Sequence, residues 1–201
     1  INDNKPVRGK KGKHHEIEIK GLHPNTTYEY TVKYGGNTQT YTLRTAPKPG
    51  SRAKFTFAYA SDSRSGSGGG ERDIGGTNAY IMKKIMALAT MKNSAFLQFT
   101  GDMITGYKMY MDEMQLEYAN WKKAIQPWAH HMPVITGMGN HEILMNTYYD
   151  PESGVRADVD QFPYQTSSSE SLYAAEFVNP LNGPTSEDGA SYDPSVSTTD
   201  F

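Results

Sequence analysis

The sequence contains no cysteine, so neither a disulfide framework nor a thiolate metal site can form. Any metal ion must therefore be bound by oxygen and imidazole ligands. Long apolar runs are missing too. The longest falls far short of the roughly 20 residues that a membrane helix needs, and residues 1–13 lack the apolar segment of a signal peptide. We therefore predict no membrane span.

An excess of charge of one sign is also absent. The 201 residues include 20 basic and 22 acidic side chains, for a formal net charge of -2. This balance gives no support to a nucleic-acid-binding surface or a polybasic membrane patch. The chain is instead well supplied with turn-forming and aromatic residues, with 19 Gly, 11 Pro and 14 Tyr. These numbers indicate a loop-rich globular protein that contains one domain, or one domain with an appendage.

Residues 14–45 are predicted to form strands, because apolar and polar residues alternate there with a period of two. The alternating runs are HHEIEIKGL, TYEYTVKYG and TQTYTLRTA, and GGN between the last two predicts a hairpin turn. The segment LHPNTTY, which ends at Tyr28, resembles the tyrosine corner of fibronectin type III domains and related sandwiches. A complete sandwich needs roughly 100 residues. The resemblance therefore implies that residues 1–47 are the C-terminal strands of a partial all-β, fibronectin-III-like domain.

A Pro- and Gly-rich linker, APKPGSRA, separates these strands from a region with a different pattern. The runs KFTFAYAS, SAFLQFTGD and MPVITGMGNHE are predicted strands, and two helical segments lie between them. The first helix is expected at 76–93 with Thr77 or Asn78 as its N-cap, and the second at 110–126, ending near Pro127. The order strand, helix, strand, helix, strand predicts an α/β domain with a parallel βαβαβ core.

From about residue 150 the sequence is dominated by Ser, Pro, Gly, Asn and Asp. We predict a long loop there, with at most one short strand or helix at 171–178. A structureless end of this length leads us to expect that the fold is completed beyond this chain.

Three features outside the strand ends receive structural interpretations. The glycine-rich segment 65–76 lacks the Lys-Ser/Thr ending of a phosphate-binding P-loop, so we interpret it as a surface loop. His130 and His131 precede Pro133 at a strand entrance and are expected to be surface residues. Six methionines follow helical spacing and are interpreted as core residues: they are at 82, 86, 91, 109, 111 and 114.

Polar residues follow each of the three predicted strands of the second region, in ASDSRSG, TGDMITG and GMGNHE. The carboxyl ends of parallel strands are where ligands bind, so we predict one cleft built from Asp62, Asp102, Asn140 and His141. Hard oxygen donors joined by imidazole suit Mn, Fe or Zn. A carboxylate shared by two ions can hold both at about 3.5–4 Å from each other.

In this order, SDSR, GDMIT and GNHE resemble the motifs of the calcineurin-like metallophosphoesterases. With the strand module in front, the chain is most similar to the purple-acid-phosphatase-like members that carry a fibronectin-like domain. The resemblance covers roughly residues 14–145. It implies that residues 48–201 are the N-terminal part of an α/β (α+β) metallophosphoesterase sandwich. It also implies two divalent or trivalent transition-metal ions, Fe, Mn or Zn, and a small phosphorylated substrate.

The resemblance assigns a role to each matching residue. Asp62 would ligate the first ion, Asp102 would bridge both ions, and Asn140 would ligate the second ion and face the substrate. His141 would be the catalytic residue that assists at the phosphate or the leaving group. Arg64 stands where many members of the family have a metal-binding His. Its guanidinium stays protonated and cannot ligate a cation, so we expect Arg64 to bind a phosphate.

Two further departures from the family pattern concern the metal centre. Purple enzymes place an iron-binding Tyr where this chain has Thr105, so the charge-transfer colour is expected to be absent. The family also supplies further histidine ligands downstream, yet no His follows His141 here. We therefore expect the chain to be part of a longer enzyme.

The resulting hypothesis is metal-dependent hydrolysis of a phosphate ester, with a monoester preferred as substrate, by an extracellular or periplasmic protein. Two alternatives stay open. One is a non-catalytic surface-binding module that keeps the scaffold without a complete metal centre, and the other is a phosphodiesterase or nucleotidase of the same fold. Taken alone, Asp62 would be read as a turn residue. The metal-site hypothesis depends on the combination of all three segments.

Overall fold

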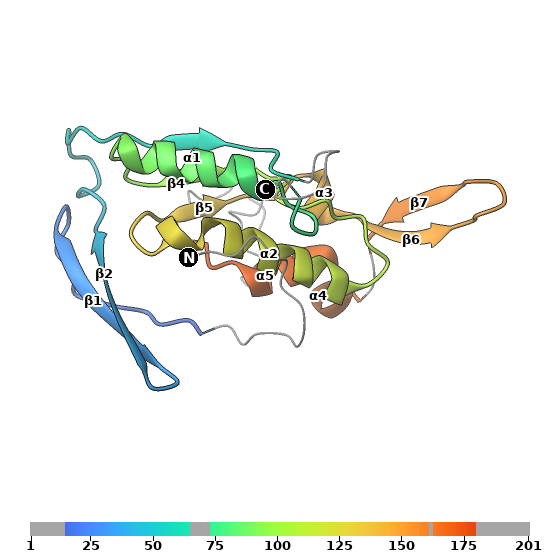
Figure 1. Ribbon diagram of the computed structural model, residues 1–201, viewed down its shortest axis with the longest axis horizontal. Helices are drawn as coiled ribbons and strands as arrows, with labels where there is room; N and C mark the ends of the chain where they lie inside the picture. The colour runs from blue at the N-terminus through green and yellow to red at the C-terminus, as the bar shows by residue number, and fades with distance from the viewer. Residues whose placement is uncertain (1–14, 65–72, 161–162, 180–201) are drawn as a thin grey trace.

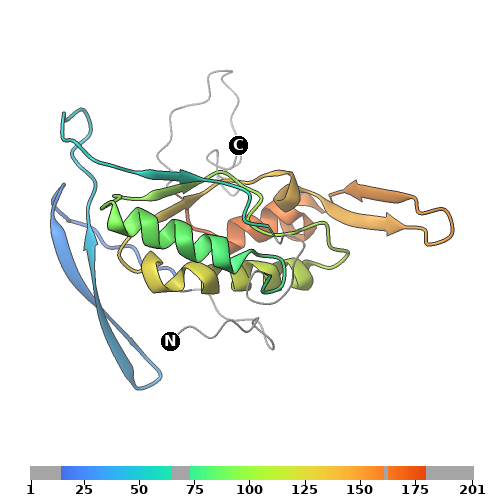
Figure 2. The same ribbon diagram turned by 45° about the horizontal axis from the view of Figure 1, so that its top comes forward.

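A three-stranded parallel sheet forms the centre of the computed structural model, which describes residues 15–64, 73–160 and 163–179. Its strands, in spatial order, are β3 (Ala58–Ala60), β4 (Leu97–Phe99) and β5 (Val134–Thr136). The connections contain α1 (Ala79–Met91) and α2 (Met111–Ala129). Both helices lie on the same side of the sheet (Figure 2). The predicted βαβαβ order and the parallel pairing are confirmed, and the metallophosphoesterase sandwich stays a prediction.

The two faces of this sheet have different environments, because alternate residues of a strand point to opposite sides. Leu97 and Phe99 are fully buried, and the Phe99 ring meets the Trp121 ring of α2 at a centroid distance of 5.5 Å. On the opposite face, Phe57 is 51% exposed and stacks on Phe96 at 5.2 Å. The hydrophobic core therefore lies between the sheet and its helices, and the other face presents aromatic rings.

Methionine contributes much of the core. Six methionines are at most 1% exposed: Met82, Met86, Met103, Met114, Met132 and Met145. The unbranched thioether side chain fills irregular gaps between helices and sheet. The interpretation of Met91 and Met109 as core residues was wrong, since they are 79% and 45% exposed. Both lie at the outer ends of their segments, where helical spacing no longer reports the buried face.

The start of α1 agrees with the sequence prediction, and the end of α2 lies slightly beyond it. Asn78 caps α1 as predicted, because its side chain accepts a hydrogen bond from the backbone N–H of Ile81 at 3.2 Å. The helix α2, predicted to end near Pro127, continues two residues beyond that proline to Ala129. Proline removes one N–H donor. Pro127 lies two residues before the end of α2, so the missing N–H removes only one backbone hydrogen bond of the helix.

An antiparallel hairpin of β1 (Thr27–Tyr34) and β2 (Asn37–Arg44) precedes the sheet, with a turn at Gly35 as predicted. The Tyr28 hydroxyl accepts a hydrogen bond from the His23 N–H at 2.8 Å, which is the backbone tie of a tyrosine corner. The strand predicted at 14–22 was wrong over the described residues from 15 onward, where no strand forms.

The hairpin contacts the end of α2 through aromatic side chains. The Tyr30 hydroxyl donates to the carbonyl of His130 at 2.6 Å, and the Tyr41 ring lies 4.5 Å from the His130 ring. His131 packs edge-on against His130 at 4.8 Å. Burial, together with the neighbouring His130, lowers the pKa of His131. The hairpin thus covers part of His130, and both histidines are half-buried.

Two short elements follow β5 before residue 150, α3 (Asn140–Ile143) and β6 (Met145–Tyr149). The region predicted as a long loop from about residue 150 contains β7 (Arg156–Val159), α4 (Tyr164–Ser167) and α5 (Ser169–Glu176). The strands β6 and β7 form an antiparallel hairpin that projects from the rest of the molecule (Figure 1). The loop prediction was therefore wrong over β7 and α4. The short element expected at 171–178 corresponds to α5.

None of the helices in the described part of the chain combines the length and the apolar character needed to cross a membrane. The predicted surface loop at 65–76 falls partly outside the described residues, which resume at Asp73. There the Asp73 side chain accepts hydrogen bonds from the N–H groups of Gly75 and Gly76.

Candidate functional site

The loops that follow β3 and β4 are joined by backbone hydrogen bonds. The N–H of Asp62 donates to the carbonyl of Gly101 at 3.1 Å, and the N–H of Arg64 donates to the carbonyl of Asp102 at 2.9 Å. Asp62 and Asp102 both have a positive φ, at 61° and 54°. The first two predicted segments therefore lie side by side at the carboxyl edge of the sheet.

The loops after β4 and β5 approach each other through two glycines. A Cβ on Gly101 would lie 2.3 Å from the backbone nitrogen of Gly139, and a Cβ on Gly139 would lie 2.2 Å from Oδ1 of Asp102. No side chain fits at either position. The close approach brings the Asp102 carboxylate next to the start of α3, which carries Asn140 and His141.

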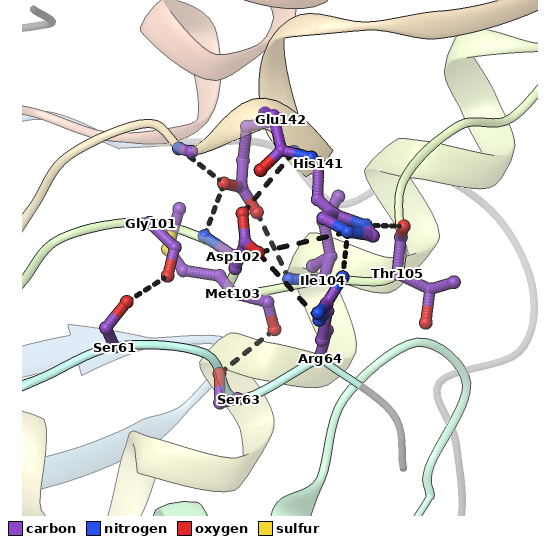
Figure 3. Close-up of polar contacts among 12 residues, drawn as sticks. Ser61, Ser63, Arg64, Gly101, Asp102, Met103, Ile104, Thr105, His141 and Glu142 are labelled. Carbon is purple, nitrogen blue, oxygen red and sulfur yellow. Dashed lines mark hydrogen bonds and ion pairs between the residues drawn. The ribbon is translucent and has the colours of Figure 1, made fainter. Parts of the chain in front are cut away.

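A buried carboxylate fastens these same loops together (Figure 3). Glu142 is fully buried, and its Oε2 accepts from the N–H groups of Asp102 at 2.7 Å and Gly139 at 2.8 Å. Its Oε1 accepts from the N–H of Ile104 at 3.2 Å. Burial raises the pKa of Glu142 to about 7, although the three N–H groups act in the opposite direction. Glu142 thus holds the Asp102 loop against α3.

Glu142 is the last residue of the GNHE segment, and no role was predicted for it from the sequence. One local signal was available, because an acidic residue three positions after a helix N-cap often accepts from the N-cap N–H. The N-cap here is Gly139. The bonds to Asp102 and Ile104 cross to another loop, and the local sequence contains no sign of them.

Replacing Glu142 with glutamine is expected to lower the free energy of unfolding by about 2–3 kcal/mol, because hydrogen bonds to a charged group are lost and an amide NH₂ would face backbone donors. Urea denaturation measures this change. Glu29→Gln, at an exposed position of β1, is the matched control and should change stability by less than about 0.5 kcal/mol. Equal effects of the two substitutions would show that Glu142 does not fasten the loops.

Asp102 lies between a guanidinium and an imidazole. Its Oδ2 is 3.8 Å from Nε of Arg64 and 3.8 Å from Nε2 of His141. Nη1 of Arg64 also contacts Nε2 of His141. Nδ1 of His141 lies 2.5 Å from the carbonyl oxygen of Thr105. A carbonyl can only accept a hydrogen bond, so we assign the proton of the neutral ring to Nδ1, which leaves Nε2 as an acceptor facing Arg64.

Tyr107 also belongs to this site, although no motif in the sequence pointed to it. Its hydroxyl accepts from Nδ2 of Asn140, and its ring meets the His141 ring edge-on at a centroid distance of 4.6 Å. The contact uses the amide nitrogen of Asn140, which leaves the amide oxygen for a cation or a substrate. Tyr107 has a positive φ of 50°. An aromatic residue in the loop after GDMIT was the only sequence signal.

The structure brings the predicted residues together to different degrees. Arg64, Asp102 and His141 are in direct contact, whereas Asn140 is adjacent to His141 on α3 and bonds to Tyr107. Asp62 is joined to the Asp102 loop through its backbone, and its residue is exposed.

The ligand atoms of this site are of the right chemical type for a metal ion, but there are few of them. The side chains of Asp62, Asp102 and Asn140 offer the hard oxygen atoms that divalent cations take as ligands. Among the described residues, however, no three side chains of His, Cys, Asp or Glu form a group that could hold a metal ion. These residues therefore fit part of the shell of one ion, and the expected pair of ions stays a prediction.

A comparison of the chain with models of known protein families gave no match. The resemblance to the metallophosphoesterases therefore stays a prediction from the segments SDSR, GDMIT and GNHE.

Proposed function

We propose that this chain supplies one side of the catalytic centre of a metal-dependent phosphoester hydrolase that acts on phosphate monoesters outside the cytoplasm. The main support is the contact of Arg64, Asp102 and His141 at the carboxyl edge of a parallel sheet. Such a group combines a guanidinium for phosphate oxygens, a carboxylate for a cation and an imidazole for a proton.

In this proposal Asp62, Asp102 and Asn140 would hold the metal. A bound transition-metal ion supplies Lewis acidity and makes water a nucleophile near neutral pH. The residues of the chain have separate tasks. The side chain of Arg64 is 45% exposed, so its guanidinium can meet a substrate that arrives from solvent and bind two of its phosphoryl oxygens. Asp102 keeps that guanidinium at the edge of the sheet.

His141 is the candidate for proton transfer. Its Nδ1 proton is held by the Thr105 carbonyl, and the Tyr107 ring supports the imidazole from the side. Nε2 is the ring nitrogen that contacts Arg64, so it faces the point where that guanidinium would hold the phosphate. In its protonated form this nitrogen can donate to the departing oxygen of the ester.

The test is the hydrolysis of a generic aryl phosphate by the intact protein, with metal analysis before and after chelation. We expect bound transition metal, loss of turnover on chelation, and recovery when Mn²⁺ or Zn²⁺ is added back. A bis-aryl phosphate assayed in parallel distinguishes a phosphodiesterase from the proposed monoesterase.

A non-catalytic binding module is the second candidate. It is favoured by one observation, the ion pair in which Arg64 already partly neutralises Asp102. An intact protein that contains no metal and hydrolyses neither ester would support this candidate and overturn the proposal.

A further inference from the structure

We propose that the outer face of α1 is a docking surface for an acidic amphipathic helix of a partner protein. The residues of this surface, which we name the α1 seam, are Ile81, Lys84, Leu88 and Met91. Docking there requires none of the residues of the candidate functional site, so it is an activity separate from the proposed hydrolysis.

The helix α1 has apolar side chains on two faces, and the described part of the chain covers one of them. On the inner face Met82 and Met86 are fully buried in the core. On the outer face Ile81, Leu88 and Met91 are 42%, 56% and 79% exposed. The outer face of a surface helix normally carries polar and charged side chains. Since α1 lies at the outside of the molecule (Figure 2), its outer apolar side chains can be reached by a partner.

The spacing of the α1 seam is that of a contact between two helices. Its four residues are separated, in order, by three, four and three positions. Apolar residues at this spacing occupy the a and d positions of helices that pack side by side. A helix that lies in a membrane surface needs a broader apolar face, and Lys84 interrupts the apolar row at its centre. The seam therefore fits one partner helix better than a lipid surface.

The charge around the seam specifies the chemistry of the partner. No acidic residue occurs in the sequence between Asp73 and Asp102, whereas Lys83, Lys84 and Lys92 all lie in this stretch. Two copies of the seam would bring lysines together without a carboxylate from either helix, so self-association is disfavoured. A partner helix with carboxylates beside its apolar row is complementary in charge.

A second segment without acidic residues adds positive charge at the end of α1. The N–H of Ala95 donates to the carbonyl of Thr56 at 2.7 Å, so the chain that follows α1 lies beside the segment that leads into β3. That segment contains Arg52 and Lys54 and has no acidic residue from 45 to 61. The positive charge near the seam thus comes from two parts of the chain, although the whole protein has a net charge of -2.

Lys84 is held in a position that suits recognition of a carboxylate. Its Nζ lies 4.2 Å from the centroid of the Tyr80 ring, a cation–π contact that keeps the ammonium against the helix surface. A carboxylate of the partner opposite the centre of the seam can pair with this ammonium. A single polar residue within an apolar seam fixes the register of two helices, so Lys84 favours one alignment of the partner.

The experiment measures the binding of two synthetic peptides to the intact protein by fluorescence anisotropy. Both peptides are about 20 residues long, which is sufficient for a helix in isolation, and both carry leucine at their a and d positions. One peptide has glutamate at the flanking e and g positions, and the other has lysine there. We expect the acidic peptide to bind at least about tenfold more tightly, because like charges oppose binding of the basic one.

Three variants locate the binding site. Leu88→Glu places a negative charge within the apolar row and is expected to weaken binding of the acidic peptide at least about tenfold. Leu116→Glu is the matched control, since Leu116 is 37% exposed on α2, and it should leave the affinity unchanged. Lys84→Glu is expected to reverse the preference between the two peptides. Circular dichroism checks that each variant folds, as expected for exposed side chains.

Several results would overturn the proposal. They are an intact protein that binds neither peptide, equal affinities for the two peptides, and an unchanged affinity of Leu88→Glu for the acidic peptide. A wild-type dimer in analytical ultracentrifugation that Leu88→Glu dissociates would assign the seam to a second copy of the chain. Binding to vesicles of phosphatidylcholine and phosphatidylserine that Leu88→Glu abolishes would assign it to a lipid surface. Either assignment would replace the partner helix. None of these measurements depends on turnover, so a failure of the proposed function leaves their outcome unaffected.

Discussion

Asp102→Asn is expected to lower the turnover of an aryl phosphate by about 1,000-fold or more. Asparagine keeps the shape of the side chain and can still accept from the N–H of His141, but it removes the negative charge that attracts a cation and pairs with Arg64. A Lewis-acid ion contributes several kcal/mol to such a reaction, and each 1.4 kcal/mol corresponds to a factor of ten in rate. The measurements are kcat and the metal content of the purified variant.

The matched control for this prediction is Asp112→Asn, an exposed aspartate in the first turn of α2. It should retain the activity and the metal of the wild type. If Asp102→Asn also retained both, Asp102 would not belong to the catalytic centre, and the meeting of the three loops would need another explanation.

Gly101→Ala is expected to lower the free energy of unfolding by about 2–5 kcal/mol. Two costs add together. An L-residue at a φ of 108° is strained, which costs about 1–2 kcal/mol, and the new Cβ would meet the Gly139 backbone at 2.3 Å, which costs about 1–3 kcal/mol more. Because the clash is with backbone atoms, no side-chain rotation relieves it. Urea denaturation measures the loss, and activity should fall with it as the loops separate.

Gly50→Ala separates the two costs. Gly50 has a φ of 76°, but a Cβ there would meet nothing within 4 Å. The control should therefore show only the strain, about 1 kcal/mol. Similar losses at both positions would mean that the Asp102 loop and the start of α3 move apart easily. The tight approach at Gly101 would then not determine the site.

The parts of the fold that the sequence predicted are those encoded over short distances. The Asn78 cap depends on residues within one helical turn, and the hairpin turn at Gly35 depends on adjacent glycines. The parallel sheet followed from the alternation of strand and helix patterns. The convergence of SDSR, GDMIT and GNHE followed from the rule that parallel strands end at the same edge.

The wrong predictions concern segments whose structure depends on distant partners. The run at 14–22 has the alternation of a strand, but no neighbouring strand pairs with its described residues, and Ile17 is 81% exposed. The strand β7 was missed because the sequence from about residue 150 has the polar composition of a loop, although DPESG before it is a turn signal. In both cases, whether the segment forms a strand depends on pairing with another strand and not on the local sequence pattern.

The site shows the same limit. Asp102, His141 and Arg64 could be nominated from short motifs, but their contact depends on a fold that joins residues about 40 and 80 positions apart. Tyr107 and Glu142 act through bonds to other loops, with Asn140 in one case and with Asp102 and Ile104 in the other. Such roles appear only when the loops are in place.

The methionine-rich interior has a consequence for oxidative damage. In a protein without cysteine, thioethers are the principal sulfur atoms open to peroxide. Met91, at 79% exposure, would form a sulfoxide early and without harm to the fold. The six enclosed thioethers are protected only as long as the protein stays folded. A polar sulfoxide formed on any of them during a transient opening would hinder the return to the native state, so oxidation would turn brief unfolding into lasting inactivation.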